Sequence, residues 1–190
     1  MQPGVVIAII VVVGLLILIG LPVAWYNKLV RLRHLIAESW GNVDVQLKRR
    51  YDLIPNLVNV VKGYAQHERD TLQTVIDARN RAEANHGAVG SQARDEQQFV
   101  AAARQLFAVV ESYPDLKASQ QFGALQQELV NTEDRIAAAR RFYNANVRDY
   151  NVARTTFPTM LMTRFGDFPP AEFFEVEEMT VRQAPAVSLA

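Results

Sequence analysis

The sequence predicts an all-α protein with a single N-terminal transmembrane helix, an elongated antiparallel bundle of about four helices, and an extended C-terminal tail. Three observations support this fold class. The N-terminal stretch has no charged residue, apolar residues recur at helical spacing over most of the remainder, and no stretch alternates as a strand does. We expect four regions, at residues 1–4, 5–24, 25–158 and 159–190.

The second region predicts the transmembrane helix. Of its 20 residues, 17 are hydrophobic. Twenty residues in a helix span a hydrocarbon core of roughly 30 Å, and a backbone in lipid must satisfy its own hydrogen bonds. Trp25 and Tyr26 follow, where interfacial aromatic residues belong. The basic leader and small-residue cleavage site of a signal peptide are missing, so we expect an uncleaved anchor.

Flanking charge predicts how the anchor is oriented. No Lys, Arg, Asp or Glu lies in residues 1–27, whereas three cations follow within nine residues of the apolar segment. The positive-inside rule then places the bundle in the cytoplasm and the short N-terminus outside. The predicted membrane-surface contacts are Trp25, Tyr26, Lys28, Arg31 and Arg33.

Helical spacing continues beyond the membrane segment. A first apolar stripe runs to about Arg50, where Pro55 predicts a kink or short break because proline lacks an N–H. A second and a third stripe lie on either side of a glycine-containing loop at residues 85–91. We expect the longest helix between Phe122 and Phe157, followed by an acidic and aromatic tail.

Composition excludes several kinds of chemistry. The chain has 20 Lys+Arg against 20 Asp+Glu, which disfavours a general nucleic-acid binder. It has no cysteine, which excludes disulfides, thiolate nucleophiles and cysteine zinc sites. We find no nucleophile-elbow serine and no phosphate-binding loop. We therefore expect no catalytic residue, cofactor, metal ion or small-molecule substrate.

One partial motif leaves an enzymatic alternative open. His67 and Glu68 begin the zinc-binding pattern HExxH, but Thr71 stands where the second histidine is needed. We expect His67 to be a half-exposed residue of the second helix. An enzyme that uses His67 and Glu68 is the weakest of our hypotheses.

The densest polar constellation lies within residues 44–57. Lys48, Arg49 and Arg50 are consecutive and cannot all face one way on a helix. In an intramolecular interpretation, which we favour, Asp44 pairs with Lys48, Arg49 or Arg50 pairs with the longest helix, and Asp52 caps the segment after the break. The alternative is a docking surface. The candidate residues are Asp44, Lys48, Arg49, Arg50, Asp52, Pro55 and Asn56.

Several motifs together resemble the LemA family of bacterial membrane proteins. They are YNKLVRLR at 26–33, WGNVDVQLKRRYDLIPNLV at 40–58, VKGYAQHE at 61–68, ESYPDLKA at 111–118, ARRFYN at 139–144 and YN at 150–151. Tyr51 departs from the family pattern, in which this position is often small. The resemblance implies a membrane-anchored helical bundle with a short external N-terminus, a cytoplasmic domain and an envelope function, and it supplies no catalytic residues.

These observations favour a non-enzymatic scaffold of the bacterial cell envelope. We expect a single-pass protein of the cytoplasmic membrane that binds further copies of itself, other envelope proteins, or both. The alternative is an adaptor or accessory subunit of a membrane protease, which would present substrates to it.

Overall fold

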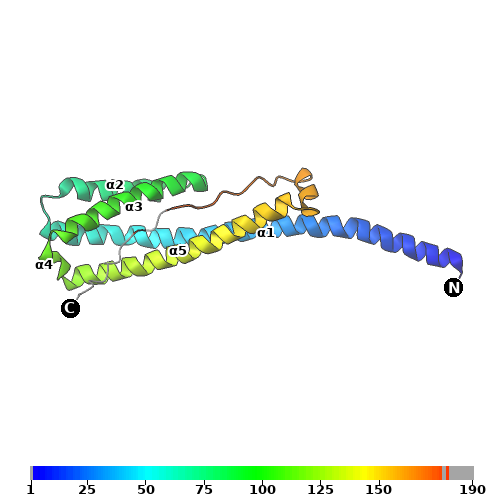
Figure 1. Ribbon diagram of the computed structural model, residues 1–190, viewed down its shortest axis with the longest axis horizontal. Helices are drawn as coiled ribbons and strands as arrows, with labels where there is room; N and C mark the ends of the chain where they lie inside the picture. The colour runs from blue at the N-terminus through cyan, green and yellow to red at the C-terminus, as the bar shows by residue number, and fades with distance from the viewer. Residues whose placement is uncertain (1, 177–178, 180–190) are drawn as a thin grey trace, which may run out of the picture. The chain divides into compact units, whose positions relative to one another are not determined.

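The computed structural model of the chain describes residues 2–176 and 179 (Figure 1). Within these residues all regular structure is helical, which confirms the predicted fold class of a long apolar N-terminal helix and a helical bundle. The elements are α1 (Pro3–Tyr64), α2 (Arg69–Ala84), α3 (Val89–Glu111), α4 (Pro114–Lys117), α5 (Gln120–Thr155) and the 3-10 helix η1 (Thr159–Arg164).

The chain divides into two compact units. Unit 1 comprises residues 1–39 and 144–171, and unit 2 comprises residues 40–143 and 172–190. Helices α1 and α5 each contribute residues to both units. The acidic pair Glu177–Glu178 and Arg182, which belong to the predicted tail, lie outside the described residues.

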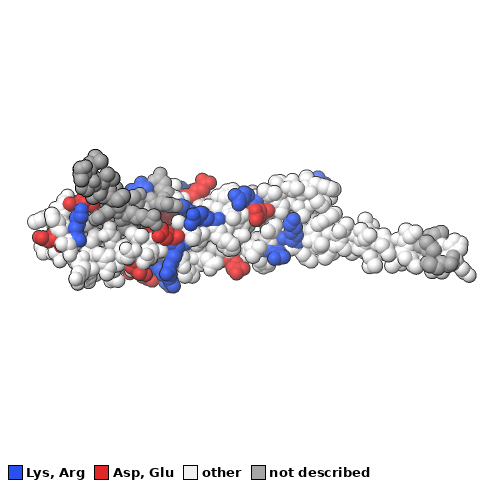
Figure 2. All heavy atoms as spheres, turned by 60° about the horizontal axis from the view of Figure 1, so that its bottom comes forward, with Lys and Arg blue, Asp and Glu red and all other residues white. Residues whose placement is uncertain are grey.

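Unit 1 contains a helical segment long and apolar enough to cross a membrane. This segment is the N-terminal part of α1, and none of it is buried within the protein. Large apolar side chains such as Ile10, Leu16 and Leu18 are exposed, and no charged side chain interrupts them on the face seen in Figure 2. Length and composition therefore fit the predicted anchor.

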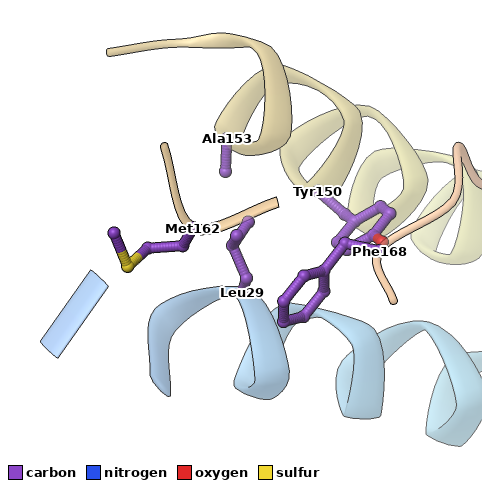
Figure 3. Close-up of a cluster of buried hydrophobic side chains, with 5 residues drawn as sticks. All are labelled: Leu29, Tyr150, Ala153, Met162 and Phe168. Atoms are coloured by element: carbon purple, nitrogen blue, oxygen red, sulfur yellow. The ribbon is translucent and has the colours of Figure 1, made fainter. Parts of the chain in front are cut away.

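A small core joins α1 to the C-terminal part of α5 in unit 1. Leu29 of α1, Tyr150 and Ala153 of α5, Met162 of η1 and Phe168 form one buried cluster (Figure 3). Asn146 of α5 donates a hydrogen bond to the carbonyl of Leu35, 3.5 Å away. Residue numbers rise along α1 as they fall along α5, so the two helices are antiparallel here.

Unit 2 is a bundle of helices and includes residues 40–143 of the region 25–158 in which a bundle was expected. Helices α2 and α3 lie side by side (Figure 1). Aromatic contacts tie this pair and α5 to the later part of α1: Tyr51 packs edge-on against Phe99, with ring centroids 6.2 Å apart, and Trp40 lies 5.2 Å from Tyr143. Helical spacing explains the core, because residues three or four apart share a face. The α1 residues Val43, Leu47, Ile54, Leu57 and Val61 are all buried.

Pro55 was predicted to cause a kink or a short break, and the break is wrong because α1 continues to Tyr64. Proline at this position cannot donate to the carbonyl four residues earlier, which belongs to Tyr51. The structure provides another donor, since Nε of Arg79 on α2 lies 3.1 Å from that carbonyl oxygen. In an isolated helix, proline would leave the Tyr51 carbonyl without a protein donor. In this protein the side chain of Arg79 on α2 supplies that donor.

Three further expectations change as a consequence. The longest helix is α1 with 62 residues, not α5 with 36. Asp52 lies exposed within an uninterrupted helix and caps no helix start. His67 is in the turn between α1 and α2, not on the second helix, because α1 ends at Tyr64 and α2 begins at Arg69.

Candidate interaction surfaces

Arg50 is buried inside the bundle of unit 2. Only 2% of it is exposed, and its guanidinium donates from Nη1 to Oε1 of Glu133, 3.0 Å away, and from Nη2 to Glu96. The guanidinium carbon also lies 4.7 Å from the centroid of the Phe99 ring. Two carboxylates and an aromatic face thus satisfy most of one buried cation, which is the arrangement that makes such a charge tolerable.

Tyr51 extends this buried network. Its hydroxyl donates to Glu96, and Nε2 of Gln92 donates to the Tyr51 oxygen at 3.2 Å and to the Ala82 carbonyl at 3.0 Å. Burial raises the pKa of Tyr51 to about 12, against the opposing effect of the Arg50 charge. The hydroxyl therefore remains a donor well above neutral pH, which suits its bond to a carboxylate.

The other candidate residues between positions 44 and 57 differ in exposure according to the face of α1 on which they lie. Asp44, Lys48, Arg49, Asp52 and Asn56 are exposed, and Pro55 is half-buried. Their spacing explains this, because residues 44, 48, 52 and 56 are one turn apart, whereas Arg50 falls on the side of Leu47 and Ile54. The long helix α5 supplies Glu133 to Arg50, as the intramolecular interpretation expects for one of these cations.

The exposed face of α1 leads into a groove between α1 and α5 in unit 2. The groove has a volume of about 640 Å³. Its polar side chains include the amides of Asn56, Asn59 and Gln121, while Gly63 and Ala124 leave room for close approach. Such a surface offers hydrogen-bond donors and acceptors beside small and apolar groups, and can accommodate a polypeptide segment.

Residues 172–174 of the tail pack onto the helices of unit 2. Phe174 is 1% exposed and lies edge-on to Trp40, with ring centroids 5.2 Å apart. The Tyr143 hydroxyl donates to the Glu172 carbonyl at 2.9 Å, and the Glu172 carboxylate accepts from the Gly90 amide at 2.9 Å, in the first turn of α3. A carboxylate there complements the unpaired amides and positive dipole end of the helix.

Three residues of α5, Tyr150, Asn151 and Arg154, hold the preceding part of the tail in unit 1. Tyr150 donates to the Pro169 carbonyl at 2.9 Å, and Arg154 donates to that of Phe168 at 3.1 Å. Asn151 makes two bonds to the backbone of Ala171, at 2.9 and 3.0 Å. The predicted sites omitted these residues. The repeated Tyr-Asn pairs, at 143–144 and 150–151, were the available signal, but nothing local specified their partners.

The predicted membrane-surface residues lie directly after the apolar segment of α1. Tyr26, Lys28 and Arg31 are exposed, and Trp25 is half-buried. Arg33 has an internal partner, since its Nη1 donates to the Asp167 carbonyl at 3.1 Å and its guanidinium carbon lies 5.7 Å from the centre of the Phe168 ring. Arg33 thus contributes to the unit 1 fold as well as to surface charge.

The residues of the enzymatic alternative do not converge. His67 is exposed in its turn, and Glu68 accepts a hydrogen bond from the Tyr113 hydroxyl at 3.4 Å. In the described part of the chain, no group of three or more His, Asp or Glu side chains is placed to hold a metal ion. A zinc motif of this type needs its ligands one turn apart on a helix, which this turn does not provide.

Comparison with known proteins places these features in a family. The LemA family model matches residues 39–189. The magnetosome protein MamQ of Magnetospirillum gryphiswaldense is 27% identical over 174 residues, which cover 78% of this chain and 64% of that protein. Protein LemA of Metamycoplasma hominis is 26% identical over 153 residues, covering 80% of this chain and 70% of that protein.

The coverage and the names of these relatives bear on function. The chain spans less than two thirds of the length of the MamQ proteins that it matches, and neither MamQ nor LemA is named for a chemical reaction. Together with the apolar part of α1, these relatives suggest a membrane-associated protein. Because the family match covers most of the chain and includes the whole of unit 2 that the structure describes, this protein belongs to the LemA family.

Proposed function

We propose that this protein is a non-enzymatic scaffold, anchored by α1 in the bacterial cytoplasmic membrane, that binds further copies of itself or other envelope proteins. One observation carries the proposal. The single helix α1 contains both an apolar segment able to cross a bilayer and an exposed polar face that runs from Asp44 to the groove at Asn59. A membrane attachment and a binding surface are the two parts that a scaffold requires.

The proposed orientation follows from charge. Lys28, Arg31 and Arg33 immediately follow the apolar segment, which has no charged residue before it. The positive-inside rule favours a cytoplasmic bundle with residues 1–4 outside. A reporter that is active only in the periplasm, fused after Ala190, should remain inactive in cells. Activity of that fusion would contradict the proposed orientation.

The groove is the proposed docking surface. Asn56, Asn59 and Gln121 present amides that can pair with a polypeptide backbone or with the amides of a second copy. The exposed charges of α1 next to it, Lys48 and Asp52, are of both signs, so they favour a partner with a mixed polar surface over a strongly charged one.

Site-specific crosslinking in living cells tests this docking surface. A photoreactive amino acid replaces Asn59 in the groove of the full-length protein. The matched control carries the same group at Gln97, an exposed amide residue of α3. We expect a discrete crosslinked product from position 59 and a much weaker one from position 97, because only the former lies at the binding surface.

The identity of the product separates the hypotheses. A second copy of the chain supports a self-associating scaffold, and several envelope proteins support a scaffold that recruits others. One dominant membrane protease supports the adaptor alternative instead. Equal, diffuse labelling from both positions would remove the groove as a docking surface.

A separate assay addresses catalysis. The purified full-length protein should leave generic phosphoester, ester and peptide substrates unchanged. Turnover that a single substitution such as His67→Ala abolishes would overturn the non-enzymatic proposal.

A further inference from the structure

Unit 1 exposes a cluster of large apolar side chains where α5 meets η1. Phe157 and Phe165 are 71% and 76% exposed, and Met160 and Leu161 are also exposed. We call these four residues the apolar corner. Single exposed apolar residues are ordinary, but four within nine positions mark a surface that meets something other than water.

The apolar corner lies beside the point where the anchor ends. Gly166 approaches Tyr26 so closely that a Cβ on the glycine would lie 3.1 Å from the tyrosine ring. Tyr26 also packs edge-on against Phe168, with centroids 5.4 Å apart. Met162, on the inner side of η1, joins the buried cluster around Leu29 (Figure 3). These contacts fix η1 next to the residues that immediately follow the apolar segment.

A groove lined by two cations and one carboxylate adjoins this corner. It has a volume of about 530 Å³ and is lined by Trp25 and Lys28 of α1, by Arg148 and Asp149 of α5, and by Phe157. Lys28 and Arg148 are both exposed. Aromatic and cationic groups together are typical of surfaces that lie at the headgroup level of a bilayer, where rings meet acyl chains and cations meet phosphates.

We propose that the apolar corner is a second membrane contact, which lies in the interface of the same bilayer that α1 crosses. Phe157, Met160, Leu161 and Phe165 contact the upper acyl chains, and the groove between Lys28 and Arg148 faces the headgroups of anionic phospholipids. The proposal rests on the proposed function only in requiring that the α1 segment crosses the membrane. A two-point contact fixes unit 1 at the bilayer more firmly than one helix alone.

The absence of cysteine makes a spectroscopic test direct, because single-cysteine variants need no background correction. Phe157→Cys and Phe165→Cys variants of the full chain are labelled with an environment-sensitive fluorophore and reconstituted in vesicles. The control is Phe142→Cys, since Phe142 is a comparably exposed phenylalanine of α5 outside the corner. We expect blue-shifted emission at 157 and 165, with quenching by spin labels on the upper acyl chains, and neither at 142.

A fourth label distinguishes the two proposals. Val13→Cys places the fluorophore within the apolar segment. If lipid quenches position 13 but not 157 or 165, the corner contact is wrong and the anchor stands. If lipid does not quench position 13 either, the anchor itself is wrong. A blue shift at 157 that depends on protein concentration and is insensitive to lipid quenchers would show that a second copy covers the corner, which overturns the lipid contact.

Lipid composition tests the role of the cations. Quenching at 157 should be stronger in phosphatidylcholine vesicles that also contain phosphatidylglycerol than in phosphatidylcholine alone. The substitutions Lys28→Gln and Arg148→Gln should each weaken this preference about fivefold, since one cation near an anionic surface has roughly that effect. The control is Arg94→Gln, which removes an exposed cation of α3 and should leave the preference unchanged. An unchanged preference in a variant that combines Lys28→Gln and Arg148→Gln would contradict the headgroup contact.

Discussion

Arg50 differs from the adjacent Arg49 in burial, although the two side chains are identical. Arg49 and Arg50 are adjacent, yet Arg49 is exposed and Arg50 is 2% exposed between Glu96 and Glu133. Removing a buried cation leaves its carboxylates desolvated and unpaired, which is more costly than the net contribution of the pair itself. Arg50 is thus a structural residue of the bundle.

Arg50→Met should therefore lower the free energy of unfolding by about 3–5 kcal/mol. Arg49→Met, on the exposed face, should change it by no more than about 0.5 kcal/mol. Urea unfolding of the full chain in detergent, followed by circular dichroism, measures both. Adding Glu96→Met to Arg50→Met should recover part of the loss. Equal effects of the two arginine substitutions would contradict the buried network.

Tyrosine ionisation gives the bundle a pH dependence at high pH. Burial raises the pKa of Tyr51 to about 12, and burial with the Glu172 charge raises that of Tyr143 to about 12. The unfolded chain ionises its tyrosines near pH 10, so it releases protons that the folded chain retains. This contribution to stability is full below pH 10 and is lost as the pH rises towards about 12.

The free energy of unfolding should accordingly fall between pH 10 and pH 12. Tyr51→Phe should make the decline shallower because it removes one of the tyrosines whose pKa is raised. Equilibrium unfolding at several pH values in this range compares the variant with the original protein. An identical slope would show that Tyr51 ionises at its ordinary pKa in the folded state.

At the scale of elements, the continuity of α1 depends on α2. Pro55 deprives the Tyr51 carbonyl of its helical partner, and Nε of Arg79 takes that place. Because Arg79 also pairs with Glu83, a single substitution mixes two effects. A double-mutant cycle separates them.

Arg79→Met should cost about 1–3 kcal/mol, the usual cost of an unsatisfied buried group. In a Pro55→Ala background the amide of residue 55 can bond to Tyr51, so Arg79→Met should cost less there. The difference, measured by unfolding of all four proteins, is the coupling between proline and arginine. Additive effects would show that Arg79 stabilises α2 alone.

The tail is the second element whose position depends on distant partners. Phe174 is buried beside Trp40, whereas its neighbour Phe173 is 42% exposed. Phe174→Ala should lower the free energy of unfolding by about 3–5 kcal/mol, as large-to-small core substitutions do. Phe173→Ala should have little effect, and equal losses would indicate that the tail does not pack as described.

At the scale of the molecule, apolar and charged residues are segregated along the chain. Residues 1–27 have no charged side chain, and the net charge of zero belongs entirely to the remainder. A chain without residues 5–24 should leave the membrane fraction after carbonate extraction, whereas the intact chain should remain in it. Retention of the shortened chain would place the membrane attachment elsewhere.

Sequence patterns predicted the presence of the helices better than the residues at which they begin and end. Apolar stripes predicted helices with one buried face, and Leu47 of α1 and Phe99 and Leu106 of α3 lie on such faces, because helical period alone specifies a face. The break at Pro55 was wrong because local propensity ignores a donor 24 residues later, at Arg79. The 3-10 helix η1 was not predicted, since residues 159–164 show no helical period.

The candidate sites divide in the same way. Exposure of Asp44, Lys48, Arg49, Asp52 and Asn56 follows from their spacing once the buried face is known. The partners of Arg50, the groove at Asn59 and the hydrogen bonds of Tyr143, Tyr150 and Asn151 to the tail join residues up to 83 positions apart. Local sequence contains no signal for such pairs.

The sequence by itself determined that the chain is helical, that one segment is apolar enough to cross a bilayer, and that cysteine chemistry is excluded. These properties depend on composition and on the 3.6-residue period, which are local. Only the tertiary structure decided which of three consecutive cations is buried, how α1 passes Pro55, and that Phe157 and Phe165 lie beside the end of the anchor. Those outcomes depend on desolvation and on contacts between distant segments, which exist only after the chain has folded.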